Sequence, residues 1–224
     1  MIIVHHLNNS RSQRILWLLE ELGLPYEIKR YQRDARTMLA PPELLAVHPL
    51  GKSPVITDGD ITVAESGAIV EYLVDTYGAQ SGLRPARGTA DDRRCTYWLH
   101  FAEGSAMPPL LMKLIFMRIK STPMPFFAKP IARGIADKVL GTFVDPNLAR
   151  QMAFMEDELA PGPWFLGPAF SVADIQMSFP IEAANQRAGL SQAKTPRLLA
   201  WLERAHARPA YQRALEHGGK YDFA

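Results

Sequence analysis

Five residues near position 60 have the types and spacing of a binding site for a short peptide: Lys52, Ser53, Pro54, Glu65 and Ser66. Pro54 holds the residue before it in an extended conformation, so the N–H and C=O of Ser53 can pair with another backbone, as an added strand does. Glu65 and Ser66 open a predicted helix, whose free N-terminal amides attract a carboxylate. Lys52 supplies a cation for a second carboxylate. Together these residues predict a pocket for an extended peptide that carries two carboxylates.

The elements that must position these residues follow from the local pattern. β-Branched residues at 55–56 and 61–63 predict two short strands, and the sequence DGD at 58–60 predicts a tight turn between them. A helix is expected over 68–77, and it is opened by the sequence ESG at 65–67. Taken one by one, the same residues also fit an ordinary strand, a turn, a capped helix and a surface lysine.

The segments GKSPVI and AESGAIVEYL resemble the glutathione-binding segment of glutathione S-transferases in order and spacing. The resemblance implies that Ser53, followed by a cis-proline at Pro54, pairs with the cysteinyl backbone of glutathione. It also implies that Glu65 and Ser66 hold the γ-glutamyl end and that Lys52 holds the glycyl carboxylate. Glutathione is itself a short peptide with two carboxylates, so this implication agrees with the pocket predicted from the residues alone.

The resemblance also implies a thiol-activating side chain just after the first strand. A free thiol with a pKa near 8.5 is mostly protonated at neutral pH, and a hydrogen bond to the thiolate together with a helix N-terminus lowers that pKa. The loop holds neither a tyrosine nor a cysteine, but Ser10, four residues before Arg14, resembles the motif of the serine-type classes. The chain is therefore similar to the serine-type, two-domain members of bacteria and fungi.

Other roles remain open for this loop. Asn8 and Asn9 carry amide donors that can also stabilise a thiolate, and Ser12 is a further candidate. Ser10 itself fits the N-cap of a capping box with Gln13 at its third position, a purely structural role for the same hydroxyl.

The resemblance implies an enzyme that conjugates the glutathione thiolate to apolar electrophiles, which is a detoxification reaction with glutathione as co-substrate. Two alternatives remain open: a glutathione-dependent reductase of disulfides or peroxides, and a non-enzymatic binding protein with a transferase-like fold. An apolar stripe that includes Met107, Leu111 and Phe116 is expected mostly as core, and in part as the lining of a second-substrate pocket.

The expected elements fall into two groups. A buried strand at 2–4 that ends at the two histidines, a helix over 15–22 and a strand over 26–31 form a β-α-β unit, which the hairpin and its helix complete. This is the order of a thioredoxin-like domain with a mixed sheet of about four strands. The later patterns are all helical, so the predicted fold class is an α/β domain followed by an all-α helical bundle.

The predicted boundaries are residues 1–79 for the thioredoxin-like domain and 89–224 for the helical domain, with a linker over about 80–88. In the helical domain, the pair Pro108-Pro109 is expected to kink or interrupt a helix. The proline-rich segment STPMPFFAKP is expected to separate two helices. The sequence SVAD further along resembles the capping box of the family and is expected to start a buried helix.

Composition places few limits on the partner. The chain has 224 residues, of which 47% are hydrophobic, and its net charge of +2 indicates no particular nucleic-acid affinity. No apolar stretch has the length of a transmembrane helix, and the N-terminus does not resemble a signal peptide. The single cysteine, Cys95, is expected to be a buried thiol, and a chain without a disulfide fits a reducing, cytoplasmic compartment.

Assembly and metal content are two further expectations. Adjacent histidines on one strand, His5 and His6, point to opposite faces, so no metal site is expected there. The resemblance implies a homodimer. The candidate contact residues for it are Tyr97, Trp98, Phe101 and Glu103.

Overall fold

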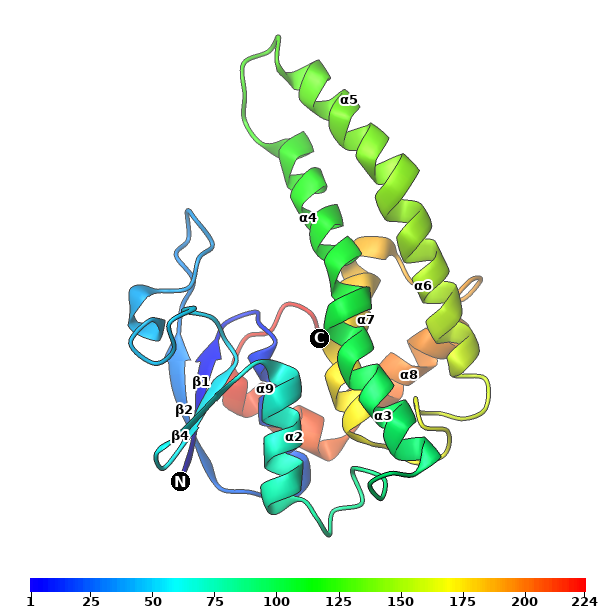
Figure 1. Cartoon of the computed structure of the whole chain (residues 1–224). Helices are drawn as coiled ribbons and strands as arrows, with labels where there is room; N and C mark the ends of the chain where they lie inside the picture. Colours follow the sequence, from blue (N-terminus) through cyan, green and yellow to red (C-terminus); the bar gives the residue numbers. More distant parts are fainter.

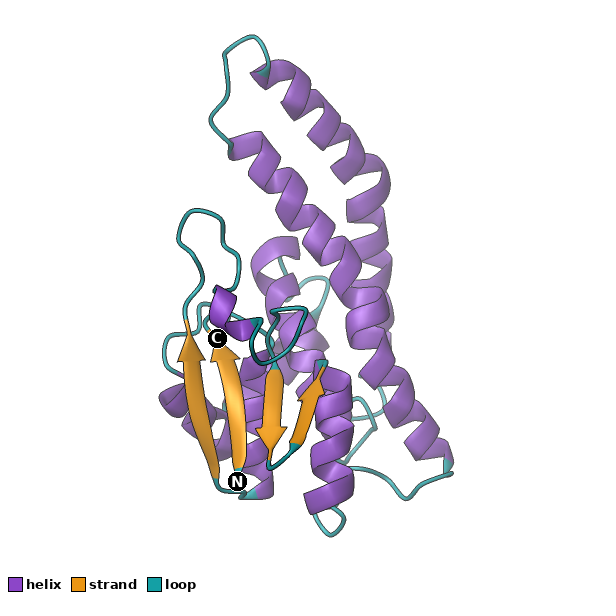
Figure 2. Cartoon of the chain, turned by 60° about the vertical axis from the view of Figure 1, so that its left-hand side comes forward, coloured by secondary structure: helices purple, strands orange, loops and turns teal.

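The computed structural model describes all 224 residues and consists of a four-stranded sheet with its helices, followed by a larger all-helical part (Figures 1 and 2). The first part ends with α2. Its elements in chain order are β1 (Ile2–Leu7), α1 (Ser12–Leu22), β2 (Tyr26–Tyr31), the short 3-10 helix η1 (Pro42–Leu44), β3 (Val55–Asp58), β4 (Ile61–Ala64) and α2 (Ser66–Tyr77). The predicted thioredoxin-like order is confirmed.

The sheet has the strand order β2-β1-β3-β4. β1 and β2 are parallel, whereas β3 is antiparallel to both β1 and β4, so the predicted mixed sheet is confirmed. Gly59 has a φ of 58° in the turn between β3 and β4, a conformation that favours glycine. β1 is longer than predicted, because His5 and His6 continue the pairing with β2 as far as Leu7.

The second part contains only helices, as predicted. Its elements are α3 (Ala90–Phe101), the π-helical turn η2 (Ala102–Ala106), α4 (Met107–Ser121), α5 (Lys129–Val139), the π-helical turn η3 (Leu140–Val144), α6 (Asp145–Glu158), α7 (Val172–Ala188), α8 (Pro196–His206) and α9 (Pro209–Gly218). α9 returns to pack on α1 of the first part. The exact domain limits stay a prediction.

The kink predicted at Pro108-Pro109 lies one turn earlier, in η2. The N–H of Met107 bonds to the C=O of Ala102 five residues back, which is the wider spacing of a π-helical turn. The two prolines occupy the first turn of α4, where a missing N–H is tolerated. The helix therefore continues through a bulge, and Glu103 lies on that bulge.

α4 and α5 form a two-helix arm that extends away from the body of the molecule (Figure 1). The proline-rich residues 122–128 join the two helices without regular helical structure, as predicted. η3 is a second bulge of this kind, and it joins α5 directly to α6.

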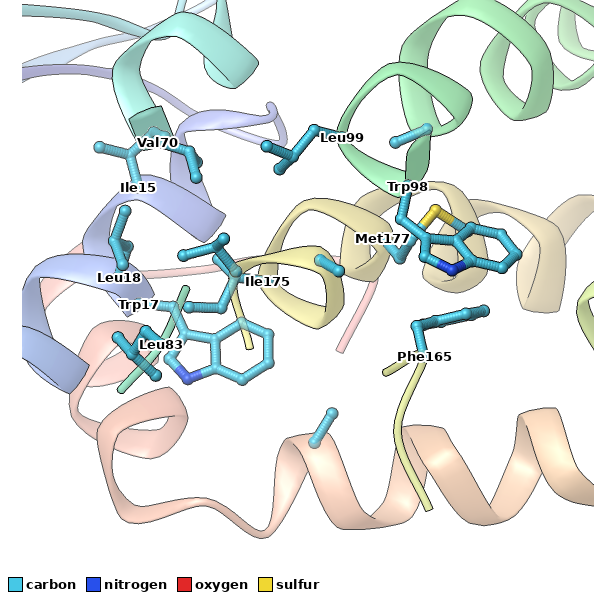
Figure 3. Close-up of a cluster of buried hydrophobic side chains, with 14 of the residues drawn as sticks. Ile15, Trp17, Leu18, Val70, Leu83, Trp98, Leu99, Phe165, Ile175 and Met177 are labelled. Carbon is cyan, nitrogen blue, oxygen red and sulfur yellow. The ribbon is translucent and has the colours of Figure 1, made fainter. Parts of the chain in front are cut away.

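One hydrophobic core joins the two parts of the molecule (Figure 3). Trp17 and Leu18 of α1 and Val70 of α2 belong to the same cluster as Ile175 and Met177 of α7, and all five side chains are fully buried. Burial of a side chain of this kind stabilises the fold by roughly 1.5–3 kcal/mol. α7 is thus the helix that sets the position of the helical part against α1 and α2.

The capping box predicted at the start of α7 is present. Ser171 Oγ accepts a hydrogen bond from Ala173 N–H, while the Asp174 carboxylate accepts from the N–H of Ser171 and of Phe165. Trp201 Nε1 also donates to Asp174, at 2.9 Å. Burial raises the pKa of Asp174 to about 6, although these hydrogen bonds act in the opposite direction and lower it. The carboxylate therefore fixes both the start of α7 and the helix beside it.

The residues suggested for a dimer contact do not share one surface. Trp98 is fully buried, Phe101 is only 9% exposed, and Glu103 turns into a cleft of the same chain. Only Tyr97, at 47%, remains an exposed contact residue, because α3 packs its other aromatic side chains into the core.

Cys95 is buried, as predicted, and burial raises the pKa of its thiol to about 11. No cluster of three or more His, Cys, Asp or Glu side chains is arranged to hold a metal ion. No helix has both the length and the apolar character needed to cross a membrane.

Candidate functional site

A cleft lies where the N-terminal ends of α1 and α2 face the η2 bulge. It contains a cavity of about 290 Å³. The residues that line this cavity are Arg11, His48, Leu50, Lys52, Pro54, Ala64, Glu65, Ser66, Glu103 and Leu111. An adjoining cavity of about 420 Å³ shares Arg11, Leu50 and Lys52 with the first and extends to Ser53. The structure therefore brings together the five residues from which the peptide pocket was predicted.

The loop before β3 presents an unpaired stretch of backbone to this cleft. The Ser53–Pro54 peptide bond is cis. Ser53 Oγ donates to the C=O of His5 at 2.8 Å, which ties the loop to β1. The N–H and C=O of Ser53 make no hydrogen bond to the backbone of the chain, so both are available to pair with an extended peptide.

Ser66 lies at the first turn of α2 with its side chain surrounded by donors. Its Oγ accepts from Arg14 Nη2 at 2.9 Å and from Gln176 Nε2 at 3.3 Å. A hydroxyl has two acceptor lone pairs and one hydrogen, so with both lone pairs occupied the hydrogen remains for the cavity that Ser66 lines. Glu65, just before it, has a φ of 71°, a conformation rare for a non-glycine residue and frequent at ligand sites.

Arg11, which directly precedes α1, and Arg14 of α1 share one carboxylate of the helical part. Arg11 Nε donates to both carboxylate oxygens of Glu103, at 2.9 and 3.0 Å, and Arg14 Nη2 also donates to Glu103. The Arg14 side chain is only 1% exposed. Burial opposes ionisation of Glu103, but the two guanidinium groups outweigh it and hold the pKa of Glu103 below its ordinary value. An ionised network thus joins α1 to η2 beside the cavity.

Comparisons with known proteins agree with this geometry. Residues 1–75 match the family model "Glutathione S-transferase, N-terminal domain", and residues 138–204 match "Glutathione S-transferase, C-terminal domain". Glutathione S-transferase 3 of Schizosaccharomyces pombe is 38% identical over 218 residues, which cover 96% of this chain and 87% of the relative. The chain belongs to the glutathione S-transferase family. The prediction of a glutathione transferase is confirmed.

Further relatives of the transferase come from yeast and bacteria. Glutathione S-transferase 1 of Saccharomyces cerevisiae is 35% identical over 223 residues, covering 96% of this chain and 94% of the relative. The crystal structure of a glutathione S-transferase from Actinobacillus pleuropneumoniae has a TM-score of 0.79 at 32% identity, covering 100% of this chain and 95% of that chain. A sphingomonad glutathione S-transferase complexed with glutathione is 25% identical with a TM-score of 0.72, covering 97% of this chain and 98% of that chain.

The two asparagines of the transferase lie away from the cleft. Asn9 donates to the Asp222 carboxylate at 2.7 Å and accepts from the Asp222 N–H at 2.9 Å. Asn8 Oδ1 accepts from the N–H of Arg33 at 2.9 Å. Both asparagines line a separate cavity near the C-terminal end of the chain, bordered by Lys220. Neither asparagine lines the two cavities that contain the predicted peptide pocket, and their role in thiol activation stays a prediction.

Ser10 does not line the cleft either. Its side chain is 3% exposed, and its Oγ lies 2.7 Å from Ser12 Oγ and accepts from Ser12 N–H at 3.2 Å. Ser12 Oγ in turn lies 2.9 Å from His6 Nδ1. The side-chain amide of Gln13 has no hydrogen-bond partner, so the alternative capping box is not formed. Both hydroxyls point into the interior because a buried histidine lies beneath them.

The three residues expected near a second substrate are separated by the packing of α4. Leu111 is 49% exposed and lines the cavity. Met107 is 4% exposed and belongs to a small core cluster, against which Phe116 also packs. Sequence reasoning missed Arg11 as a cleft residue and treated Glu103 only as a contact to a partner. The signal for Arg11 was its position, between Ser10 and Ser12 at the start of α1.

Proposed function

We propose that this enzyme transfers glutathione to apolar electrophiles and that Lys52, Ser53, Pro54, Glu65 and Ser66 hold the glutathione. The observation that carries the proposal is the convergence of these residues, from one loop and one helix start, on a single cleft. An electrophile such as an aryl chloride then reacts in one substitution: the sulfur–carbon bond forms, the carbon–chlorine bond breaks, chloride leaves, and the thiol proton goes to solvent.

Each part of glutathione has a matching group in the cleft. The unpaired backbone of Ser53 supports pairing with the cysteinyl residue, and the Ser66 hydroxyl with the start of α2 suits the γ-glutamyl carboxylate. The exposed carboxylate of Glu65 suits the γ-glutamyl amine, and the exposed Lys52 suits the glycyl carboxylate. The ligand would thus lie extended from α2 toward the loop.

The same cleft has an apolar border that suits an apolar second substrate. Leu111 of α4 and Leu50 of the loop line it, with 49% and 59% of their side chains exposed. Met107 and Phe116, buried in or packed on the core, would act only by supporting that border. We therefore assign the electrophile to the side of the cavity that faces α4.

Conjugation of a chlorinated nitrobenzene by the purified protein tests the proposal. With glutathione at saturation, the rate should exceed the uncatalysed rate and should saturate with the aryl chloride. A protein that binds glutathione by calorimetry but gives no rate above background would overturn conjugation as the main reaction.

Reduction of disulfides or peroxides is a second candidate, because no hydroxyl of the loop after β1 lines the cleft. A coupled glutathione reductase assay with a small disulfide separates the two reactions. Turnover of the disulfide in this assay, without conjugation of the aryl chloride, would show that the protein is a reductase.

Assembly, location and domain limits complete the proposal. A homodimer is supported by the exposed ring of Tyr97 and the neighbouring Phe154, which line a shallow cavity between α3 and α6. Sedimentation should give a dimer at micromolar concentration, and a monomer would contradict it. We propose a cytoplasmic detoxification enzyme whose domains span residues 1–79 and 89–224.

A further inference from the structure

The part of the cleft nearest the expected thiol has a cationic lining. If glutathione pairs with Ser53, its sulfur lies in the stretch that the two cavities share, which is lined by Arg11, Leu50 and Lys52. Of the residues that follow β1, Arg11 is the one that lines both cavities. The group placed by the start of α1 at this point is therefore a guanidinium, not a hydroxyl.

The Ser10 hydroxyl is enclosed in the interior beside the buried ring of His6. Burial first, and then the charge of Arg30, lower the pKa of His6 to about 4, against a hydrogen bond to the backbone of Gly218. The ring is therefore neutral at pH 7 and has one N–H.

The Ser10 hydroxyl belongs to a cluster of contacts inside the protein. Its Oγ lies 2.7 Å from Ser12 Oγ, which in turn lies 2.9 Å from His6 Nδ1 and 3.4 Å from the carbonyl oxygen of Leu7. Ser10 Oγ also accepts the N–H of Ser12. Ser10 thus has its hydrogen-bond partners inside the protein and lines neither cavity of the cleft.

The guanidinium of Arg11 has N–H donors that are free to bind a ligand. All of its hydrogen bonds in the chain go from Nε to Glu103. The Phe179 ring of α7 lies 5.0 Å from the guanidinium carbon and fixes the plane of the group. The four N–H bonds on the two terminal nitrogens have no partner within the chain, and the side chain is 34% exposed toward the cleft.

The net charge around Arg11 is positive, which favours an anion beside it. Glu103 is shared with Arg14, so two guanidinium groups face one carboxylate. The other charged or titratable groups around it are Lys52, His48 and Glu65 in the cavity, and Arg33 and Arg187, whose pKa values are lowered by burial and by the charge of Arg11. Glu65 is the one other carboxylate that lines the cavity.

We propose that the guanidinium of Arg11 stabilises the thiolate of bound glutathione, with Glu103 and Phe179 as positioning residues and Ser10 as part of the scaffold. This inference rests on the proposed binding of glutathione in the cleft. A cation within about 4–6 Å lowers the pKa of an acid by roughly 1–3 units. Arg11 thus holds the thiol ionised at neutral pH in place of a hydroxyl donor.

The experiment compares full-length wild type with Arg11→Gln, Arg11→Lys and Ser10→Ala, and uses Arg118→Gln on the exposed arm as a control for the loss of one charge. Ultraviolet absorbance of the thiolate, followed against pH with glutathione saturating, measures the pKa of the bound thiol. The pH profile of kcat/KM for an aryl chloride is the second readout, and the urea midpoint checks that each variant is folded.

In Arg11→Gln the pKa of the bound thiol should rise by about one unit, and kcat/KM on the acidic side of the profile should fall about tenfold and recover at alkaline pH. Arg11→Lys should retain most of the shift, while Ser10→Ala and Arg118→Gln should leave the thiol pKa as it is in wild type.

Two results would overturn the inference. If the thiol pKa in Arg11→Gln stays at its wild-type value while glutathione still binds, the role of Arg11 is refuted. A rise in the thiol pKa of Ser10→Ala returns the role to the serine. Failure of wild type to bind glutathione by calorimetry would instead refute the proposed function together with this inference.

Discussion

Arg14 Nη2 donates a hydrogen bond of 2.9 Å to Ser66 Oγ, and so joins the first turns of α1 and α2 beneath the cleft. The same guanidinium donates to the C=O of Gln176 on α7 and to Glu103 on η2. Ser66 is therefore part of the contact between the two halves of the molecule as well as a cavity residue. Its hydroxyl makes structural contacts, and in the proposed complex it also binds the ligand.

Ser66→Ala should weaken glutathione binding and the fold together. Loss of a hydrogen bond to a charged group costs roughly 1.5–3 kcal/mol, which is about ten- to a hundredfold in the dissociation constant. The donors of Arg14 and Gln176 would lose their buried acceptor, so the free energy of unfolding should also fall by about 1–3 kcal/mol. Calorimetry and the urea midpoint measure the two effects. A lowered midpoint with an unchanged dissociation constant would show that Ser66 is structural only.

Ser53→Ala is the matched control for that variant. Ser53 offers glutathione its backbone, and its hydroxyl donates to the C=O of His5. The substitution keeps the backbone groups, so the glutathione dissociation constant should change by less than about threefold, which is under 1 kcal/mol. A tenfold loss would mean that the hydroxyl itself contacts the ligand.

Lys52→Gln should weaken glutathione binding about two- to fivefold, because an exposed ion pair contributes roughly 0.2–1 kcal/mol. The matched ligand is glutathione esterified at the glycyl carboxylate. If Lys52 contacts that carboxylate, wild type should bind the ester more weakly than it binds glutathione, whereas the variant should bind the two ligands equally well. If esterification weakens binding by the same factor in both proteins, Lys52 does not contact the carboxylate.

Glu103→Gln should destabilise the fold by roughly 2 kcal/mol at neutral pH. Removing one partner of a fully buried pair costs about 3–5 kcal/mol, and the 30% exposure of Glu103 reduces that cost. The pKa of Glu103 is lower in the folded state, so the unfolded state takes up protons first as pH falls. The difference between wild type and variant should therefore be full above the ordinary pKa of 4.5 and shrink below it, as followed by urea midpoints. A difference that is constant with pH would contradict the ion pair.

His6→Gln should flatten the loss of stability in mild acid. The pKa of His6 is about 4 in the folded state against an ordinary 6.5, so the unfolded state binds the proton between these values. Its contribution is full above pH 6.5 and is lost as pH falls toward 4, by about 3 kcal/mol in all, since one pKa unit is 1.36 kcal/mol. Urea midpoints of both proteins across this range measure the effect. Parallel curves would mean that His6 is not held neutral.

The stretch proposed to bind glutathione could be predicted because its features are local. The strand, turn and helix start between Ser53 and Ser66 are set by β-branched residues, a glycine at positive φ and a helix N-terminus, all within a few residues of one another. The capping box of Ser171 and Asp174 is equally local, and it too is present. The order of strands and helices then indicates the fold, because a β-α-β unit followed by a hairpin has few ways to pair.

The environment of the thiol-activating loop depends on residues far apart in the chain. Ser10 turns inward because the Ser12 hydroxyl and the buried ring of His6 lie beneath it. Arg11 turns to the cleft because Glu103 of η2 and Phe179 of α7 hold it there. Local sequence determined which side chains stand at the start of α1. Only the packing of α7, η2 and α9 against that start decided which of them faces the cleft, because the burial and the hydrogen-bond partners of a side chain are properties of the assembled fold.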